Sequence, residues 1–146
     1  MIAASRTRLL VPLLVVLGVV LAGCGSPAAP SAPLPRGSIS DLADKLSLIV
    51  QDECQTRPAA DVYPRCGRFT AELGNVATAA QSAAAGQPKG AAVQTAATAL
   101  SAALATFTQD GCLGQTPIAK CGADQAEIQK QVTALNTAVM AVPASS

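Results

Sequence analysis

The chain of 146 residues contains five cysteines, whose thiols could form disulfides, bind a metal ion or carry a covalent modification. It contains no histidine. Histidine is the usual general base near neutral pH and the commonest metal ligand in proteins. Four of the cysteines follow one another in two pairs, Cys54 with Cys66 and Cys112 with Cys121. Both spacings are much longer than those of zinc knuckles or of Cys-x-x-Cys redox motifs. We therefore expect no metal site and no cofactor.

The acidic and nucleophilic residues form no pattern that is typical of an enzyme. The sequence has neither the Gly-x-Ser-x-Gly motif of serine hydrolases nor a glycine-rich phosphate-binding loop. Asp52 and Glu53 are adjacent, which on a helix turns their side chains about 100° apart instead of placing them on one face. We expect no catalytic residues, and the sequence predicts that the protein is not an enzyme.

The segment before Cys24 has the features of an export signal. Two cations, Arg6 and Arg8, precede an apolar run from Leu9 to Leu21, which is too short to span a bilayer comfortably as a helix. The run ends in Leu21-Ala22-Gly23-Cys24, which resembles the bacterial lipobox at all four positions. Two other readings stay open, namely an ordinary signal peptide with a chance cysteine and an uncleaved membrane anchor.

The resemblance to the lipobox implies a lipoprotein. Residues 1–23 would be removed as a signal peptide, and Cys24 would carry a diacylglyceryl group as the new N-terminus. Stable attachment to a bilayer needs about two acyl chains, which such a group supplies. The alanine-rich, lysine-poor composition is similar to that of lipoproteins of high-GC Gram-positive bacteria, including the mycobacterial group. The expected location is the cell membrane, with the chain lipid-anchored on the extracytoplasmic face.

Residues 24–37 are expected to form a tether between this lipid and a folded domain. Four prolines alternate with small residues between Gly25 and Gly37, a composition that favours extended polyproline II structure. At about 3.1 Å per residue the tether would reach about 40 Å. Without residues 1–23 the chain loses Arg6 and Arg8, so that eight cations face nine acidic residues and the net charge is −1. This balance does not favour a nucleic-acid partner.

Residues 38–146 are predicted to fold into four helices. Ser38 with Asp41 resembles a capping box that opens the first, whose apolar positions run from Ile39 to Val50. A loop is expected over residues 55–61, and Tyr63-Pro64 is expected to start the second helix. The break from Gly86 to Gly90 ends that helix.

The third and fourth helices show the same apolar periodicity. The third has its apolar stripe from Val93 to Phe107 and is stopped by Gly111. The fourth is expected to start at Thr116-Pro117, although Gly122 weakens its first turn, and to end at Pro143. Its stripe consists of Gln125, Ile128, Val132, Leu135, Val139 and Val142. Short connections favour antiparallel neighbours, so the predicted fold class is all-α, a small up-down four-helix bundle.

An even number of remaining cysteines in an exported chain favours two disulfides. In this bundle all four would lie at one end, at the termini of the predicted helices. The spacing favours pairing of neighbours, Cys54–Cys66 and Cys112–Cys121, with Cys54–Cys112 and Cys66–Cys121 as the rival arrangement. Each short loop closed in this way would add about 3 kcal/mol of stability, which suits a small domain with a largely alanine core.

Two surfaces are candidates for function. Residues 55–68 and 111–120 gather several charges around the disulfides, although a solvated, mixed-charge bundle end would look the same. Residues 73–109 carry only one charge, Lys89, which fits either an apolar docking face or a compositional bias towards alanine. We expect a non-enzymatic interaction or structural module of the cell envelope, with the membrane and an envelope protein as partners. The alternative is a carrier for a small apolar ligand or lipid held between the helices.

Overall fold

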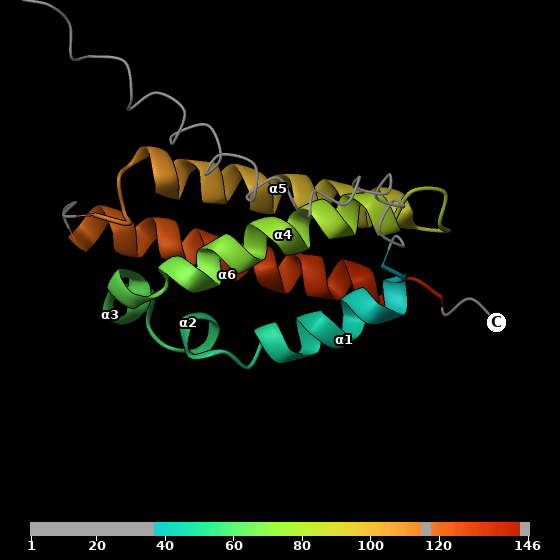
Figure 1. The fold of residues 1–146 in the computed structure, drawn as a ribbon, viewed down its shortest axis with the longest axis horizontal. Coiled ribbons are helices and arrows are strands. Elements are labelled where there is room, and N and C mark those ends of the chain that lie inside the picture. Colours follow the sequence, from blue (N-terminus) through green and yellow to red (C-terminus); the bar gives the residue numbers. More distant parts are fainter. Residues whose placement is uncertain (1–36, 115–117, 144–146) are drawn as a thin grey trace, which may run out of the picture. The chain divides into compact units, whose positions relative to one another are not determined.

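The computed structural model describes residues 37–114 and 118–143, and every regular element in these ranges is helical. They belong to one compact unit, Pro35–Ser146. The long helices in the described ranges are α1 (Ile39–Ile49), α4 (Gly67–Ala83), α5 (Gly90–Gln109) and α6 (Ile118–Met140), shown in Figure 1. The predicted all-helical class is confirmed. The expected signal peptide, Cys24, residues 25–36 of the tether and the Thr116-Pro117 start lie outside the described residues.

The predicted loop over residues 55–61 is wrong, because two short helices occupy it. They are α2 (Glu53–Thr56) and α3 (Ala59–Val62). The Asp52 side chain starts α2 by accepting a hydrogen bond of 2.7 Å from the backbone N–H of Cys54. Asp52 thereby does the work of an N-cap, which satisfies a donor that the helix itself leaves free.

The predicted start of the second long helix at Tyr63-Pro64 is also wrong. These residues belong to a single 3-10 turn, η1 (Tyr63–Arg65), and α4 begins only at Gly67. Cys66 separates the two elements because its backbone, with φ −91° and ψ 12°, leaves the α-helical conformation. Pro64 therefore lies in the first turn of a 3-10 helix, which ends directly before the disulfide-bonded Cys66.

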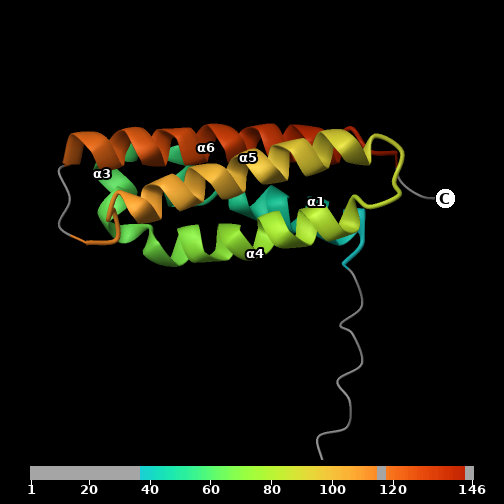
Figure 2. The same ribbon diagram turned by 90° about the horizontal axis from the view of Figure 1, so that it is seen from above.

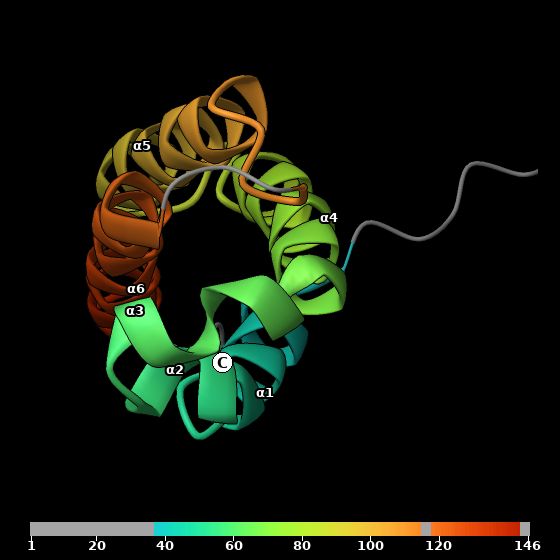
Figure 3. The same cartoon turned by 90° about the vertical axis from the view of Figure 1, so that its left-hand side faces the viewer.

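The long helices run in alternating directions along a common axis, as Figure 2 shows. Helix α5 packs between α4 and α6, and α1 packs against both α4 and α6 (Figure 3). Because α1 has only 11 residues against 23 in α6, it covers only part of the length of α6. Helices α2 and α3 and the turn η1 pack against α6 beyond the C-terminal end of α1.

The predicted apolar stripes form the core. In α5, Val93, Ala97, Leu100 and Phe107 are buried and Leu104 is partly buried. Every member of the stripe predicted for the fourth helix is also buried. Five alanines belong to the same core, namely Ala77, Ala80, Ala84, Ala97 and Ala103. Each contributes one methyl group, so this core gains less from burial than one built from leucine and isoleucine.

The ends of the helices follow the expected capping signals. Ser38 and Asp41 form the predicted capping box, in which each side chain bonds the backbone N–H of the other. At the end of α5, Gly111 has φ +71°, and the N–H groups of Gly111 and Cys112 bond the carbonyls of Thr108 and Phe107. This pattern is a Schellman motif, and it confirms Gly111 as the residue that stops the helix.

Candidate functional site: the disulfide-braced end

Two disulfides join the ends of the helices, and their pairing is the one predicted. Cys54 bonds Cys66 and Cys112 bonds Cys121, with Cα–Cα distances of 5.8 and 5.4 Å. Cys66, Cys112 and Cys121 are buried. The lipidation candidate, Cys24, lies outside the described residues.

The helix α3, the end of α5 and the start of α6 lie at the same end of the domain (Figure 2). The cysteines of the two disulfides belong to α2, to the residue before α4, to the turn after α5 and to the first turn of α6, which lie towards this end. We call the described residues of the ranges 52–68 and 110–125 the disulfide-braced end. It contains the described residues of the candidate surface expected over residues 55–68 and 111–120. The first disulfide links α2 to the residue before α4, and the second links the turn after α5 to α6. Each half of the disulfide-braced end therefore contains one covalent link between helices.

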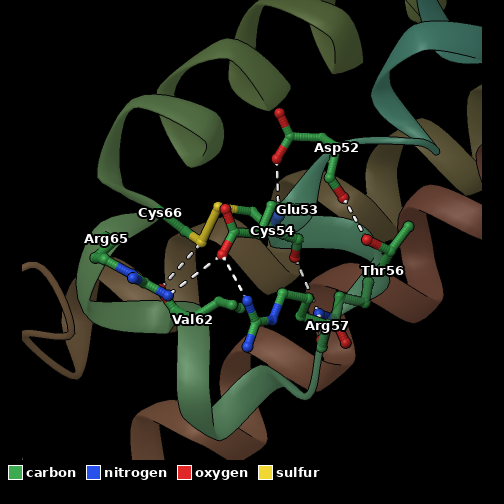
Figure 4. A network of polar contacts seen from close by, with 9 residues as sticks. Asp52, Glu53, Cys54, Thr56, Arg57, Val62, Arg65 and Cys66 are labelled. Atoms are coloured by element: carbon green, nitrogen blue, oxygen red, sulfur yellow. Dashed lines mark hydrogen bonds and ion pairs between the residues drawn. A yellow bond between two sulfur atoms is a disulfide. The ribbon is translucent and has the colours of Figure 1, made fainter.

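The outer surface of this end carries a small network of charges, shown in Figure 4. One carboxylate oxygen of Glu53 pairs with the guanidinium groups of both Arg57 and Arg65, each at 3.3 Å. All three side chains are more than half exposed, so water screens the pairs and each adds at most about 1 kcal/mol. Asp61 is exposed nearby and has no side-chain partner among the described residues. The network therefore contributes little to the stability of the domain.

Beneath this surface, glutamines of α6 bond the backbone of α2. The amide nitrogens of Gln125 and Gln129 donate to the carbonyl oxygen of Cys54 at 3.1 and 2.9 Å, and Gln129 also donates to Arg57 O at 3.0 Å. In return, the amide nitrogen of Gln55 donates to Gln129 O at 2.8 Å. We call these contacts the glutamine seam. They satisfy carbonyls that a helix as short as α2 cannot satisfy itself.

Close packing holds α3 to α6 next to the seam. A Cβ atom at Gly122 would lie 3.1 Å from both Cα and Cβ of Ala60, closer than ordinary van der Waals contact. Gly122 was expected to weaken the first turn of the fourth helix. The structure gives it a reason, because the missing side chain lets α3 approach α6.

Two carboxyl groups meet beside the second disulfide. Asp110 pairs with the ammonium group of Lys120 at 2.7 Å, which raises the pKa of Lys120. Burial raises the pKa of Asp124 above its ordinary value, and the neighbouring Asp110 carboxylate adds to this effect. An Asp124 oxygen lies 3.5 Å from Cys112 Sγ, which is a contact without a hydrogen bond because a disulfide sulfur carries no hydrogen.

The charge-poor stretch from residue 73 to 109 forms most of α4, the turn after it and the whole of α5. Helix α5 buries the stripe described above, while its outer face carries alanine, threonine, serine and glutamine. The hydroxyls on this face bond carbonyls of their own helix, as in Thr95 to Ala91 O and Thr98 to Gln94 O. Among the described residues, α5 is the helix whose length and hydropathy would allow it to cross a bilayer. Its packing between α4 and α6 is equally consistent with a core helix.

A groove of about 670 Å³ lies at the opposite end of the domain, where the chain enters at Gly37. Its apolar lining includes Ile39, Ala43 and Val142, and the side chain of Met140, 68% exposed, lies beside them. Asp44 and several serines add polar atoms to its wall. The groove is partly open to solvent and lies between the ends of α1, α4 and α6.

Within the ranges 37–114 and 118–143, no three or more His, Cys, Asp or Glu residues gather in a group that could hold a metal ion. The glutamine seam and the contact between Gly122 and Ala60 were missed from the sequence. One signal was present, because Gln125 is a polar residue at a buried position of an apolar stripe, where its amide must find partners.

No family model matches the chain, no curated protein matches it significantly, and no solved structure matches it significantly.

Proposed function

We propose that this chain is a membrane-anchored lipoprotein of the cell envelope whose helical domain is a non-enzymatic interaction or structural module. In this proposal, residues 1–23 are a removed signal peptide, Cys24 carries the lipid, and residues 24–37 are the tether. The four long helices are classed as an up-down four-helix bundle. The lipobox-like Leu21-Ala22-Gly23-Cys24 supports the anchor, and two disulfides fit an oxidising, extracytoplasmic location.

The observation that carries the proposal is the position of the disulfides relative to the chain entry. The first described residue, Gly37, lies next to the N-terminus of α1. The helix α2, the start of α4, the end of α5 and the start of α6 lie towards the other end of the long helices (Figure 1), and the four disulfide cysteines lie in or next to these elements. A domain held at Gly37 by a tether would point its disulfide-braced end away from the membrane. That end is the one whose exposed charges are mounted on a covalently fixed frame, which is a suitable platform for binding a protein partner.

A site-specific crosslinking experiment tests this orientation. A photo-crosslinking residue is placed at Asp61, on the disulfide-braced end, and in a matched chain at Leu48, which is 72% exposed on α1. We expect a discrete adduct with an envelope protein from position 61 and none from position 48. The adduct should weaken in a chain carrying Arg57→Ala and Arg65→Ala. Equal adducts from both positions, or adducts with lipoprotein-processing enzymes alone, would argue against an interaction module presented at this end.

A carrier for a small apolar molecule is the second candidate, and the groove near Gly37 is the observation that favours it. A volume of about 670 Å³ falls within the ~300–1,000 Å³ that small-molecule sites usually have. The groove lies at the end where the tether enters, and a lipid from the membrane would reach it first. Native mass spectrometry of the chain purified from membranes tests this candidate. Bound lipid that is lost in Ala43→Arg supports it, and a chain without bound lipid dismisses it.

A further inference from the structure

The two disulfides differ in how far each is shielded from solvent. Cys112 and Cys121 are 2% and 0% exposed, and both belong to the hydrophobic core. Cys66 is buried as well, but its partner Cys54 is partly exposed on the four-residue helix α2. Figure 4 shows this disulfide among the exposed side chains of the charge network. A reagent in solution therefore reaches the Cys54–Cys66 bond more readily than the Cys112–Cys121 bond.

The charges beside the sulfur atoms differ in the same direction. An oxygen of the Asp124 carboxyl group lies 3.5 Å from Cys112 Sγ, so a thiolate formed there by reduction would face a like charge. The same carboxylate repels an approaching thiolate, which is the species that attacks a disulfide. The atom beside Cys66 Sγ is the carbonyl oxygen of Val62, at 3.2 Å, which carries no net charge. Once this disulfide is reduced, that oxygen can accept a hydrogen bond from the Cys66 thiol.

The elements that each disulfide holds differ in their own stability. The first encloses α2, α3 and η1, which have four, four and three residues. Helices this short are not stable alone and depend on the disulfide and on their contacts with α6. The second joins the ends of α5 and α6, which have 20 and 23 residues and pack in the core. Because small units open locally at a lower free energy than core helices, only the first disulfide becomes accessible by local opening.

We propose that Cys54–Cys66 is a thiol-exchange site, which a dithiol reduces in the folded chain while Cys112–Cys121 stays oxidised. One thiolate of the dithiol attacks Cys54 Sγ, the S–S bond breaks, and its electron pair goes to Cys66 Sγ, which takes up a proton. The second thiol of the reagent loses its proton and attacks the mixed disulfide, and the released Cys54 thiolate takes up a proton from water. The chain gains two electrons and two protons, and the dithiol becomes a disulfide.

The redox state of this one bond then controls whether α2, α3 and η1 stay fixed to the start of α4. The oxidised form is the resting state, and reduction frees this half of the disulfide-braced end without unfolding the long helices. The inference depends on neither the lipid on Cys24 nor an envelope partner. It holds or fails whether or not the proposed function is correct.

The test uses the full chain in its folded, oxidised form, with dithiothreitol as the dithiol at mildly alkaline pH. Samples are alkylated at intervals, and peptide mapping measures the alkylated fraction of each cysteine. We expect Cys54 and Cys66 to be alkylated about tenfold faster or more, since ~1.4 kcal/mol between local opening and opening of the core helices gives tenfold. In urea, the two pairs should react at similar rates, because they join residues 12 and 9 apart. Hydrogen exchange of the selectively reduced chain should accelerate over residues 53–65 and stay slow in α5.

A pair of variants tests the effect of charge. Asp124→Asn should raise the rate at Cys112–Cys121 in the folded chain, while the rate at Cys54–Cys66 in the same sample stays unchanged. Asp44→Asn, at an exposed carboxyl group of α1, should change neither rate. An unchanged rate at Cys112–Cys121 in Asp124→Asn would contradict the protective effect of that carboxylate.

Three results with the unmodified chain would overturn the proposal. The first is reduction of both disulfides at equal rates in the folded chain, or of Cys112–Cys121 first. The second is a difference in rate that persists in urea, because it would then come from the local sequence instead of the fold. The third is unchanged hydrogen exchange over residues 53–65 after Cys54–Cys66 has been reduced.

Discussion

Replacing Cys54 and Cys66 together by alanine tests how the disulfide-braced end is held. The disulfide joins residues 12 apart in sequence, for which the chain-entropy relation gives about 2.8 kcal/mol at 25 °C. Cys112 and Cys121 are 9 apart, for which the same relation gives about 2.6 kcal/mol. On loop entropy alone, the two double variants should lose nearly equal free energies of unfolding. Either loss is a large fraction of the roughly 5–15 kcal/mol that stabilises a typical domain.

The two variants should nevertheless differ in local behaviour. Cys54 also supplies the carbonyl that Gln125 and Gln129 bond, and α2 has only four residues of its own. Without the first disulfide, we expect residues 53–65 to open as a unit while α5 and α6 stay folded. Urea unfolding followed by far-UV circular dichroism measures the loss, and hydrogen exchange locates it. Unchanged unfolding, or exchange that accelerates equally in α5, would refute the reasoning.

Three further predictions concern single side chains, each measured by urea unfolding. Gly90→Ala should destabilise the domain by about 2 kcal/mol or more, because the new methyl group would overlap the carbonyl oxygen of Ala84. Gly74→Ala, which has open space around it, should stabilise the domain by up to about 1 kcal/mol. Equal effects of the two variants would contradict this packing. Ser38→Ala should cost about 1 kcal/mol through loss of the capping box, and no loss would mean that the cap is unimportant. The folded state raises the pKa of Asp124, so this carboxyl favours folding below its unfolded pKa near 3.8, and that contribution disappears as the pH rises through the higher folded pKa. The free energy of unfolding of Asp124→Asn, relative to that of the unmodified chain, should therefore rise between pH 3 and pH 7. A relative free energy that falls over this range would show that burial does not control the pKa of this group.

Much of the fold could be predicted because it depends on local signals. The apolar stripes follow helical periodicity, and Ser38, Gly111 and the break at residues 86–90 are capping and turn residues whose effect depends on a few neighbours. The disulfide pairing followed from the same helix boundaries. Cysteines at the ends of successive helices come close wherever a short connection joins them, so Cys54–Cys66 and Cys112–Cys121 were favoured over the rival arrangement.

The candidate site was less predictable because its contacts join residues that are far apart in sequence. The glutamine seam pairs Gln125 and Gln129 with Cys54, about 70 residues earlier. The short helix α2 has no periodicity to reveal it and depends on its cap and these partners. Gly122 looked like a weak point of a helix, since a close approach to Ala60 is visible only once α3 is placed against α6. The groove near Gly37 likewise needs the ends of three helices together.

The proposed function requires that Cys24 is acylated in an oxidising compartment while the other four cysteines are paired. Intact-mass measurement of the chain purified from its native membranes, alkylated without prior reduction, tests this directly. We expect a chain that begins at Cys24, carries the mass of a diacylglyceryl group and has gained no alkyl groups. A chain of unlipidated mass, or one that has gained four alkyl groups, would contradict it.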